Sequence, residues 1–372
     1  MRILFVVYGS DLGGAERSAL DCAAQLTREG TFQVVVACMP ATPVWNKAVE
    51  DGLDTCPVGF PSLEGVNGLS AVHKGLGTLR TAFLLGQLIR RHRAKLVHAN
   101  GIKAAVASVV GAGLARVPVV FHVRDYPRRP VLHRFVCSAA SATIVPSIFI
   151  RNSMPDGCPR VHVVANGVNA PVSLPARGEA RRSIGVDFEK VLVTAVAQLV
   201  PWKRHDVFLM AAAILARERP NSHFCIVGGD IWGRNKVYVE KLRQLAAAPS
   251  LSGKVTFTGY CSNATGIIAD SDVLVLPSER EPFGRVVVEA WHCGTPIIAA
   301  NGSGPEEMIE HGRTGFLFQH GSVEDLVRIL NELVEDVSLR RRCAREGRRQ
   351  CEKYSVERHT KAVAAIYRDI LS

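Results

Sequence analysis

The 372-residue sequence lacks the features that mark several classes of protein. Its longest apolar stretch without a charge, Ala104–Ala115, falls well short of the ~20 residues that a membrane-spanning helix needs. Aromatic residues make up only 6% of the chain, so no stacking platform for nucleic-acid bases accompanies its basic residues. No low-complexity tract or sustained heptad repeat occurs, which excludes collagen-like, disordered and coiled-coil architectures. We therefore expect a soluble globular protein of two domains that binds no nucleic acid.

The cysteines also lack the spacing of a metal or disulfide site. None of the ten stands in a CxxC pair, and Cys38, Cys225 and Cys293 lie in apolar segments. This pattern predicts reduced, mostly buried thiols in a cytoplasmic protein. The apolar start of the chain, Ile3–Val7, is too short for a secretory signal, which favours the same compartment.

Acidic residues are missing from one long part of the chain. The formal net charge is +11, and no Asp or Glu occurs between Glu64 and Asp125. The window from Lys74 to Arg134 holds 12 basic residues and a single acid. Such an excess is typical of proteins that bind nucleic acid, an anionic membrane surface or an acidic substrate. Because the aromatic content argues against nucleic acid, the membrane surface and the acidic substrate remain.

The chain does contain a regular alternation of short β-branched runs and helical stretches. Near-continuous apolar runs such as Val34–Cys38 predict strands that are covered on both faces, as in a parallel sheet. The predicted strands are Arg2–Tyr8, Phe32–Met39, Leu96–Ala99, Pro118–Val123, Ala142–Pro146, Val161–Ala165, Val191–Gln198, His223–Gly228, Val255–Thr258, Asp272–Leu276 and Thr295–Ala300. The predicted helices include Gly14–Arg28, Leu69–Arg93, Lys103–Leu114, Pro130–Ala140, Lys203–Arg217, Asn235–Ala248, Gly284–His292 and Ser322–Val334.

Strand–helix alternation with right-handed crossovers makes a doubly wound domain. The pattern weakens at 169–180, where two prolines and a glycine predict a linker, and restarts after it. The expected fold class is therefore α/β, with two tandem Rossmann-like doubly wound domains at 1–170 and 171–350. Residues 351–372 are expected to form a C-terminal helix that packs back on the first domain. In this architecture a ligand would lie in the cleft between the domains, where strand carboxyl ends and helix N-termini converge.

The strongest constellation of functional residue types follows a predicted strand of the second domain. A helix beginning near Phe283, after a turn that contains Gly284, would present free N–H groups to an anion. Glu281 precedes this helix and Glu289 lies near its second turn, so two carboxylates accompany the helix end. This combination suits a sugar that is joined to a ribose through a diphosphate. A capping glutamate and a surface salt bridge are the structural alternative.

Two further loops carry groups that suit a phosphate. Lys203 is predicted to open the first helix of the second domain, where a cation can neutralise the charge of a leaving diphosphate. In the first domain Gly9, Gly13 and Gly14 precede a helix and allow close backbone approach. Their spacing is not GxGxxG, and GxxxxGK[ST] is absent, so a dinucleotide site is disfavoured. A solvated lysine and a tight turn without a ligand are the alternatives.

Together these strings resemble the retaining nucleotide-sugar glycosyltransferases of the GT-B fold, family four. The resemblance extends over essentially the whole chain, is densest at 191–318, and is most specific in the Glu-x7-Glu spacing with its Pro-Phe-Gly turn. It implies an acceptor-side first domain and a nucleotide-sugar donor domain after it. The strings that carry it are Gly13–Glu16, Asn166–Val168, Pro201–Lys203, Pro277-Ser278, Glu281–Gly284, Glu289-Ala290, Gly294–Pro296 and Gly312–Phe316.

The resemblance implies roles for individual residues of the second domain. Glu289 would bind the ribose hydroxyls of the donor nucleotide. Glu281, with the amides of Phe283 and Gly284, would hold the transferred sugar. Lys203 would hold the diphosphate.

In the first domain the resemblance implies that Gly14 lets its loop approach the diphosphate. His122, at the end of a predicted strand, would line the site near the transferred sugar, with a structural histidine as the alternative. The expected catalytic residues are thus Glu281, Lys203 and His122. Such enzymes usually need no metal, and the chain shows no DxD flanked by apolar residues, so neither a metal nor another cofactor is expected.

The chain departs from the family pattern at three positions. Gln198 stands where an arginine is usual, which removes a charge-assisted contact worth about 1.5–3 kcal/mol when desolvated. Arg204 follows Lys203 where glycine is common, and we expect it to replace part of that contact. Both Gln198 and Arg204 are therefore counted among the donor-binding residues. Ser303 interrupts the usual paired glycines before Pro305.

The expected function is transfer of a sugar from a nucleotide-diphosphate-sugar to a hydroxyl, with retention of the anomeric configuration. The expected acceptor is a lipid-linked or anionic glycan in cell-envelope polysaccharide synthesis. Arg124, Arg128 and Arg129, directly after His122, favour an anionic acceptor. Two alternatives stay open: a nucleotide-sugar epimerase, and a non-catalytic nucleotide-sugar-binding component of a glycan assembly complex. Gln198 is the feature that keeps the second alternative open.

A predicted helix in the basic window bears on the membrane question. Leu76, Leu79, Phe83 and Leu88 form an apolar stripe that ends in the basic run Arg90–Arg93. One interpretation is a core helix with a basic, solvated end. The other is a surface that docks on anionic lipid or takes a lipid-diphosphate or phosphorylated glycan acceptor. The protein is accordingly expected in the cytoplasm, with peripheral attachment to the inner face of the cytoplasmic membrane left open.

Overall fold

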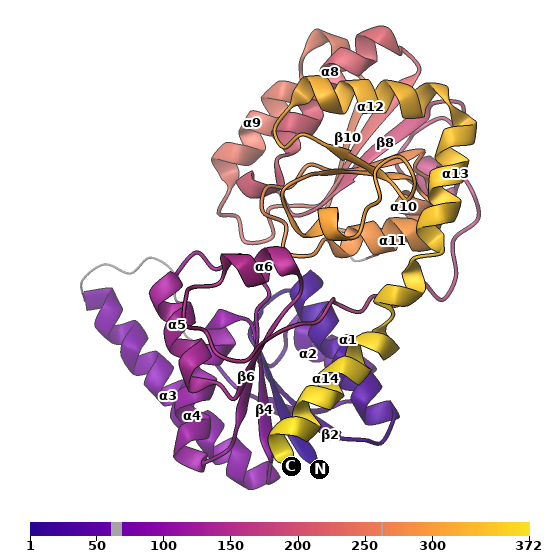
Figure 1. Ribbon diagram of the computed structural model, residues 1–372. Coiled ribbons are helices and arrows are strands. Elements are labelled where there is room, and N and C mark those ends of the chain that lie inside the picture. Colours follow the sequence, from indigo (N-terminus) through magenta and orange to yellow (C-terminus); the bar gives the residue numbers. More distant parts are fainter. Residues whose placement is uncertain (61–68, 262) are drawn as a thin grey trace. The chain divides into compact units, whose positions relative to one another are not determined.

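The computed structural model describes residues 1–60, 69–261 and 263–372, with side chains from Gly75 onward in the second range, so the side chain of Lys74 lies outside it. The chain divides into two compact units: Met1–Asn169 with Tyr354–Ser372, called unit 1, and Ala170–Lys353, called unit 2. Each unit contains its own parallel sheet with helices packed against it (Figure 1). This is the α/β, doubly wound class that the alternating sequence pattern predicts.

Unit 1 contains a seven-stranded parallel sheet in the order β3-β2-β1-β4-β5-β6-β7. The central strand β1 is buried because its alternate residues face opposite helical layers: Leu4 and Val6 pack on one side, and Ile3, Phe5 and Val7 on the other. The strands are β1 (Arg2–Val7), β2 (Gln33–Cys38), β3 (Asp54–Pro57), β4 (Leu96–Asn100), β5 (Val119–His122), β6 (Ala142–Val145) and β7 (Val161–Val163).

Two helical layers cover this sheet (Figure 1). The layer on the side of Leu4 and Val6 consists of α3 (Leu69–His92), α4 (Ile102–Ala115), α5 (Pro130–Ala139) and α6 (Ile148–Ser153). The opposite layer consists of α1 (Gly14–Arg28), α2 (Pro43–Glu50) and α14 (Val356–Leu371). The last helix, α14, belongs to unit 1, where it contacts α1 and buries Val363 and Tyr367.

Unit 2 contains a six-stranded parallel sheet in the order β10-β9-β8-β11-β12-β13. Its main core joins strand residues such as Phe224 to residues of the covering helices such as Phe208 and Leu330. The strands are β8 (Val191–Val196), β9 (Ser222–Val227), β10 (Val255–Gly259), β11 (Val273–Leu276), β12 (Ile297–Ala300) and β13 (Phe316–Phe318). The α-helices are α7 (Glu179–Ser183), α8 (His205–Glu218), α9 (Lys236–Ala246), α10 (Thr265–Asp270), α11 (Arg285–Cys293), α12 (Val323–Glu335) and α13 (Val337–Arg348).

The elements that the sequence analysis missed are mostly short. The strand β13 has three residues and the helix α10 has six, too few for a periodic pattern to show. No element was predicted between residues 40 and 57, where the structure has the helix α2 and the strand β3. Within the described ranges, no helix is both long and apolar enough to cross a membrane.

The apolar stripe of α3 is not a core face, which corrects the first of the two interpretations of this helix. Leu76, Leu79 and Phe83 are exposed, whereas Leu88 is half-buried against the core. The face turned to the sheet consists of Ala82, Leu85 and Ile89. Small residues at the contact with α4, among them Ala82 and Gly111, let the two helices approach closely.

Candidate functional site

The closest contact between predicted site residues joins Lys203 to Glu281 in unit 2. The Lys203 ammonium donates a hydrogen bond to Glu281 Oε2 at 2.6 Å, and both side chains are largely buried. The same ammonium lies 4.1 Å from the centre of the Trp202 ring, in a cation–π contact. A largely buried ion pair of this kind is stable only as long as each charge keeps a partner.

Adjacent strands bring these two side chains together. β8 and β11 are parallel neighbours, so the loops that follow them leave the same edge of the sheet. The loop after β8 forms a 3₁₀ turn, η1 (Pro201–Lys203). The backbone amide of Glu279, in the loop after β11, donates to the carbonyl of Trp202 at 2.7 Å. This hydrogen bond ties the two loops together.

Both helices near the site begin later than the sequence analysis predicted. α8 begins at His205, because Arg204 has a φ of 51° and cannot continue a right-handed helix into η1. α11 begins at Arg285, because Gly284 has a φ of 88°. Lys203 and Phe283 therefore belong to the preceding loops.

The loop after β12 closes on the turn that carries Glu281. The Gly304 amide donates to the Glu281 carbonyl at 2.9 Å, and a Cβ at Gly304 would lie 2.5 Å from the Pro282 carbonyl oxygen. A Cβ at Gly284 would lie 2.9 Å from Pro305 Cγ. Glycine is required at both positions, and the backbone of Glu281 is thereby held in place at the start of α11.

Glu289 lies in the second turn of α11, eight residues after Glu281. Its Oε1 is 3.6 Å from Arg285 Nε, and its side chain is partly exposed. A contact of this length is longer than a hydrogen bond, so the carboxylate keeps the capacity to accept hydrogen bonds from neighbouring hydroxyls. Glu281 and Glu289 thus stand on either side of the start of one helix.

Gln198, which replaces the usual arginine, and Arg204, which was expected to make up part of the lost contact, are placed differently. Gln198 follows β8 and is half-buried. The Arg204 guanidinium donates to Asp206 Oδ1 at 3.2 Å, and Lys241 donates to the other oxygen at 3.2 Å. Although burial raises the pKa of Asp206, the Lys241 and Arg204 contacts lower it below its usual value. Arg204 is therefore paired with a carboxylate, and its role toward a diphosphate stays a prediction.

In unit 1, Glu16 holds the glycine loop. The Gly13 amide donates to Glu16 Oε2 at 3.1 Å, and a Cβ at Gly9 would lie 3.0 Å from Glu16 Cγ. Burial raises the pKa of the Glu16 carboxyl to about 7. Gly14 is exposed as the first residue of α1. In the sequence Glu16 stands out only as the last residue of the string Gly13–Glu16, although its place as the third residue of the helix is the usual one for such a contact.

His122 lies in a buried cluster of aromatic side chains rather than at a surface. His122 Nδ1 is 3.3 Å from His98 Nε2, and His98 Nδ1 is 2.6 Å from Tyr367 Oη. The ring of His359 stacks on that of His122 with 5.7 Å between the centroids. Burial, together with the charge of Arg124, holds the pKa of His98 and His122 well below the usual value. Both imidazoles are therefore neutral at physiological pH.

Arg124 is buried beside this cluster. Its Nε donates to Asn100 Oδ1 at 2.5 Å, and its Nη1 donates to Asn166 Oδ1 at 2.5 Å and to Ser18 Oγ at 3.2 Å. The structure buries both Arg124 and His122, and the expectations that Arg124 faces an acceptor and that His122 lines a sugar site stay predictions. The reason for the burial is tertiary, since α14 contributes partners that enclose the ends of β4 and β5.

Arg128 and Arg129 keep the exposure that an acceptor-side role needs. Asn100 and Asn166 were assigned no role by the sequence analysis. The available signal was the position of Asn100, a polar residue at the end of an otherwise apolar strand.

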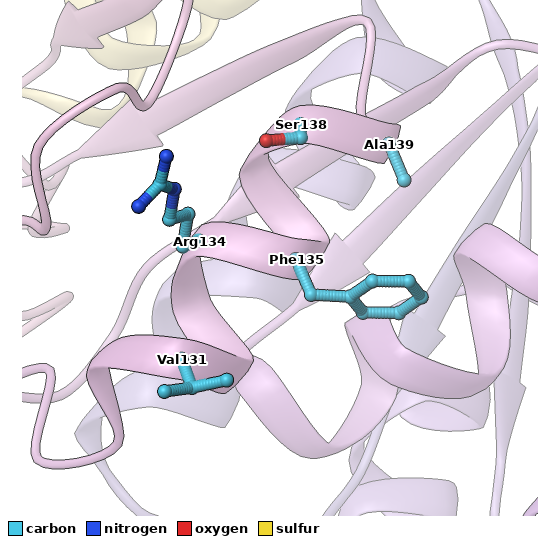
Figure 2. Close-up of a pocket in the computed structure, with 5 residues that line it drawn as sticks. All are labelled: Val131, Arg134, Phe135, Ser138 and Ala139. Atoms are coloured by element: carbon cyan, nitrogen blue, oxygen red, sulfur yellow. The ribbon is translucent and has the colours of Figure 1, made fainter.

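A shallow hollow on unit 1 is lined by Val131, Arg134, Phe135, Ser138 and Ala139, all on α5 (Figure 2). None of the predicted site residues lines it. In the part of the chain that the structure describes, no group of three or more His, Cys, Asp or Glu side chains is arranged to hold a metal ion.

Family comparisons match both units. Residues 176–350 match the family model described as glycosyl transferases group 1, and residues 12–170 match the model described as glycosyltransferase family 4. Together the two matches cover most of the chain, which therefore carries a glycosyltransferase domain in each unit. The resemblance drawn from the motifs is thereby confirmed, and with it the two-domain GT-B fold.

The chain has curated relatives in several bacteria. The D-inositol 3-phosphate glycosyltransferase of Rhodococcus opacus (strain B4) is 34% identical over 215 residues, which cover 56% of this chain and 48% of the relative. The lipopolysaccharide core biosynthesis glycosyltransferase LpsE of Rhizobium meliloti (strain 1021) is 34% identical over 108 residues, which cover 29% and 32%. The chain thus spans about half or less of the length of these curated relatives.

Solved structures match over the full length. Anabaena HepE, in complex with UDP and glucose, has a TM-score of 0.84 and 25% identity over 99% of each chain. A glycosyltransferase from Rickettsia africae ESF-5 has a TM-score of 0.82 at 19% identity, over 100% of this chain and 98% of that one, which shows the fold alone.

Proposed function

We propose that the protein transfers a sugar from a nucleoside-diphosphate-sugar to a hydroxyl acceptor, with retention of the anomeric configuration. The observation that carries the proposal is the 2.6 Å contact between Lys203 and Glu281 beside the start of α11. It gathers a cation, a carboxylate and the N-terminus of a helix, which suit a leaving diphosphate and the hydroxyls of a sugar. The two family matches support the same class of reaction.

The proposal gives each of these groups one task. Lys203 and the amides of Phe283 and Gly284 stabilise the negative charge that develops as the bond between the anomeric carbon and the diphosphate oxygen breaks. Glu281 accepts hydrogen bonds from the transferred sugar, and Glu289 accepts them from the ribose. The proton of the acceptor hydroxyl passes to an oxygen of the donor phosphate, because His122 is buried. No step is assigned to a metal or another cofactor.

UDP-sugars are the first donors to test, because the Anabaena relative was solved with UDP-glucose and with UDP and glucose. As acceptor we propose a lipid-linked or anionic glycan of the cell envelope. Relatives named for inositol 3-phosphate and for lipopolysaccharide core biosynthesis support this choice. The exposed Arg128 and Arg129 supply positive charge for an anionic group.

The test compares transfer rates of the wild type with those of Lys203→Ala and Glu281→Ala, using labelled UDP-sugars and a panel of acceptors. We expect both variants to lose about a thousandfold or more in rate while remaining folded. The matched control is Glu240→Ala combined with Arg243→Ala, which removes an exposed ion pair of 3.9 Å and should keep the full rate. Full activity in both site variants would contradict the proposal.

A non-catalytic nucleotide-sugar binder is the second candidate. Gln198 in place of an arginine and the pairing of Arg204 with Asp206 favour it, because both reduce the positive charge available to a leaving diphosphate. Thermal stabilisation by UDP without transfer to any acceptor would support this candidate. Incubation of the protein with the donor alone tests the remaining alternative, because an epimerase would convert the sugar nucleotide without an acceptor.

A further inference from the structure

The outer face of α3 carries large apolar side chains in water. Leu76, Leu79 and Phe83 lie about one helical turn apart, and their exposed fractions are 60%, 58% and 57%. A helix that covers a sheet normally turns such a stripe toward the core. On α3 the stripe is turned away from the sheet, and this inversion needs a physical cause.

The cause is close packing between α3 and α4 through small residues. A Cβ at Gly111 would lie 2.4 Å from the Ala82 carbonyl oxygen, and a Cβ at Gly86 would lie 3.2 Å from the Gly111 carbonyl oxygen. The core side of α3 is completed by Leu85 and Ile89. These approaches anchor α3 against α4 around Ala82 and Gly86.

Helix α5 adds a second apolar surface to the same layer. Val131 and Phe135 are exposed at 83% and 53%, and Arg134 stands beside them (Figure 2). α4 contacts both α3 and α5, and all three helices pack on the same side of the sheet (Figure 1). Two helices of one layer therefore expose large apolar side chains on their solvent sides.

Positive charge is concentrated in the part of the chain that carries these side chains. Between Gly75 and Phe135 the chain has eleven Lys and Arg residues and one acid, Asp125. Arg80 follows Leu79 on α3, and Arg128 and Arg129 directly precede α5; all three are exposed. Apolar side chains among arginines are complementary to a bilayer interface, which offers phosphate groups above an acyl region.

We propose that Leu79, Phe83, Val131 and Phe135, with Arg80 and Arg134, form a docking face for an anionic lipid bilayer. The apolar side chains enter the headgroup region, and the two guanidinium groups bind lipid phosphates. Membrane docking is a property separate from sugar transfer. It rests on the proposed function in one respect only: a bilayer bound at this face would bring the protein to a lipid-linked acceptor. Its test requires neither donor nor acceptor.

The test is flotation of the full chain with vesicles of phosphatidylcholine, with and without phosphatidylglycerol. We expect the wild type to float with the anionic vesicles and to be released by salt. Leu79→Gln combined with Phe83→Gln should lower the partition coefficient about tenfold, because apolar area no longer enters the interface. Arg80→Gln combined with Arg134→Gln should lower it by a similar factor on anionic vesicles.

Matched controls come from exposed positions of unit 2. Val237→Gln on α9 and Arg341→Gln combined with Arg342→Gln on α13 remove similar groups and should leave flotation unchanged. All variants should keep the thermal midpoint of the wild type, since the substituted side chains are exposed.

Three outcomes would overturn the proposal: a wild type that floats with neither vesicle, face variants that float like the wild type, or a wild-type dimer that Leu79→Gln with Phe83→Gln converts to a monomer. The last outcome would assign the face to a second copy of the chain. Flotation without sugar transfer would leave this inference standing and remove the proposed function, and transfer without flotation would do the reverse.

Discussion

Polar side chains follow the strands of both sheets, and the two units use them differently. In unit 2, the described contacts of Lys203 are the Glu281 carboxylate and the Trp202 ring. In unit 1, Arg124 is buried with hydrogen bonds to Asn100, Asn166 and Ser18. A ligand phosphate can replace one carboxylate at modest cost, whereas an enclosed guanidinium loses its partners only if the fold opens. A strand-end cation therefore suits binding only where the tertiary structure leaves its partner exchangeable.

The largest effect is expected when the Lys203–Glu281 ion pair of unit 2 is neutralised. Lys203→Met combined with Glu281→Gln leaves no lone buried charge, so we expect little change in the free energy of unfolding. We expect the rate of sugar transfer to fall by about a thousandfold or more. Denaturant unfolding and initial-rate measurements on the same preparation check both. A large loss of stability would show that the pair is structural, like the cluster in unit 1.

The converse substitution in unit 1 is Arg124→Met. It leaves the side chains of Asn100 and Asn166 without their charged donor, so we expect a loss of about 3 kcal/mol in the free energy of unfolding. The affinity for UDP of the protein that remains folded should be unchanged. Denaturant titration and calorimetry measure the two quantities. A stable variant with weakened UDP binding would instead place Arg124 in the binding machinery.

Gly284 tests how the backbone supports the Lys203–Glu281 contact. Gly284→Ala strains a φ of 88° and brings a Cβ to 2.9 Å from Pro305, so we expect a loss of about 2 kcal/mol in stability and weaker donor binding. Gly294→Ala is the matched control. Gly294 has a φ of 71°, but its Cβ would meet no heavy atom of the described residues within 4 Å. Equal losses in the two variants would mean that the approach of Pro305 is unimportant.

The smallest expected effect is on the pH dependence of stability, to which buried histidines of both units contribute: His98 and His122 in unit 1, and His205 and His223 in unit 2. Burial lowers the pKa of His98 and His122 below 6.5 in the folded state, so below that pH the unfolded chain binds protons that the folded chain does not. The free energy of unfolding should fall with decreasing pH by up to ~1.4 kcal/mol per pH unit for each imidazole.

Glu16 acts in the opposite direction, because its raised pKa of about 7 favours the protonated, folded state as the pH falls from about 7 toward 4.5. The measurement is therefore made in a Glu16→Gln background, with and without His122→Asn. We expect the second substitution to reduce the slope of stability against pH below 6.5. An unchanged slope would show that His122 takes up protons in the folded state.

The motifs could be assigned from sequence because each depends on residues that are close along the chain. Glu281, Gly284 and Glu289 belong to one turn and one helix, and Lys203 follows a strand whose apolar pattern is plain. The helix starts were predicted too early, since the positive φ of Arg204 has no counterpart in residue type. The burial of His122 could not be predicted either, because Tyr367 and His359 come from a helix more than two hundred residues away.

The sequence by itself determined the family, the two α/β domains and the residue types of the proposed donor site, because strand periodicity and loop motifs are local properties. Only the tertiary structure decided which strand-end groups are enclosed and which keep an exchangeable partner. It also decided that the apolar stripe of α3 faces solvent, since the close approach at Gly111 depends on two helices packing together. Burial and partner number are properties of packing between distant segments, and the order of residues along one segment does not contain them.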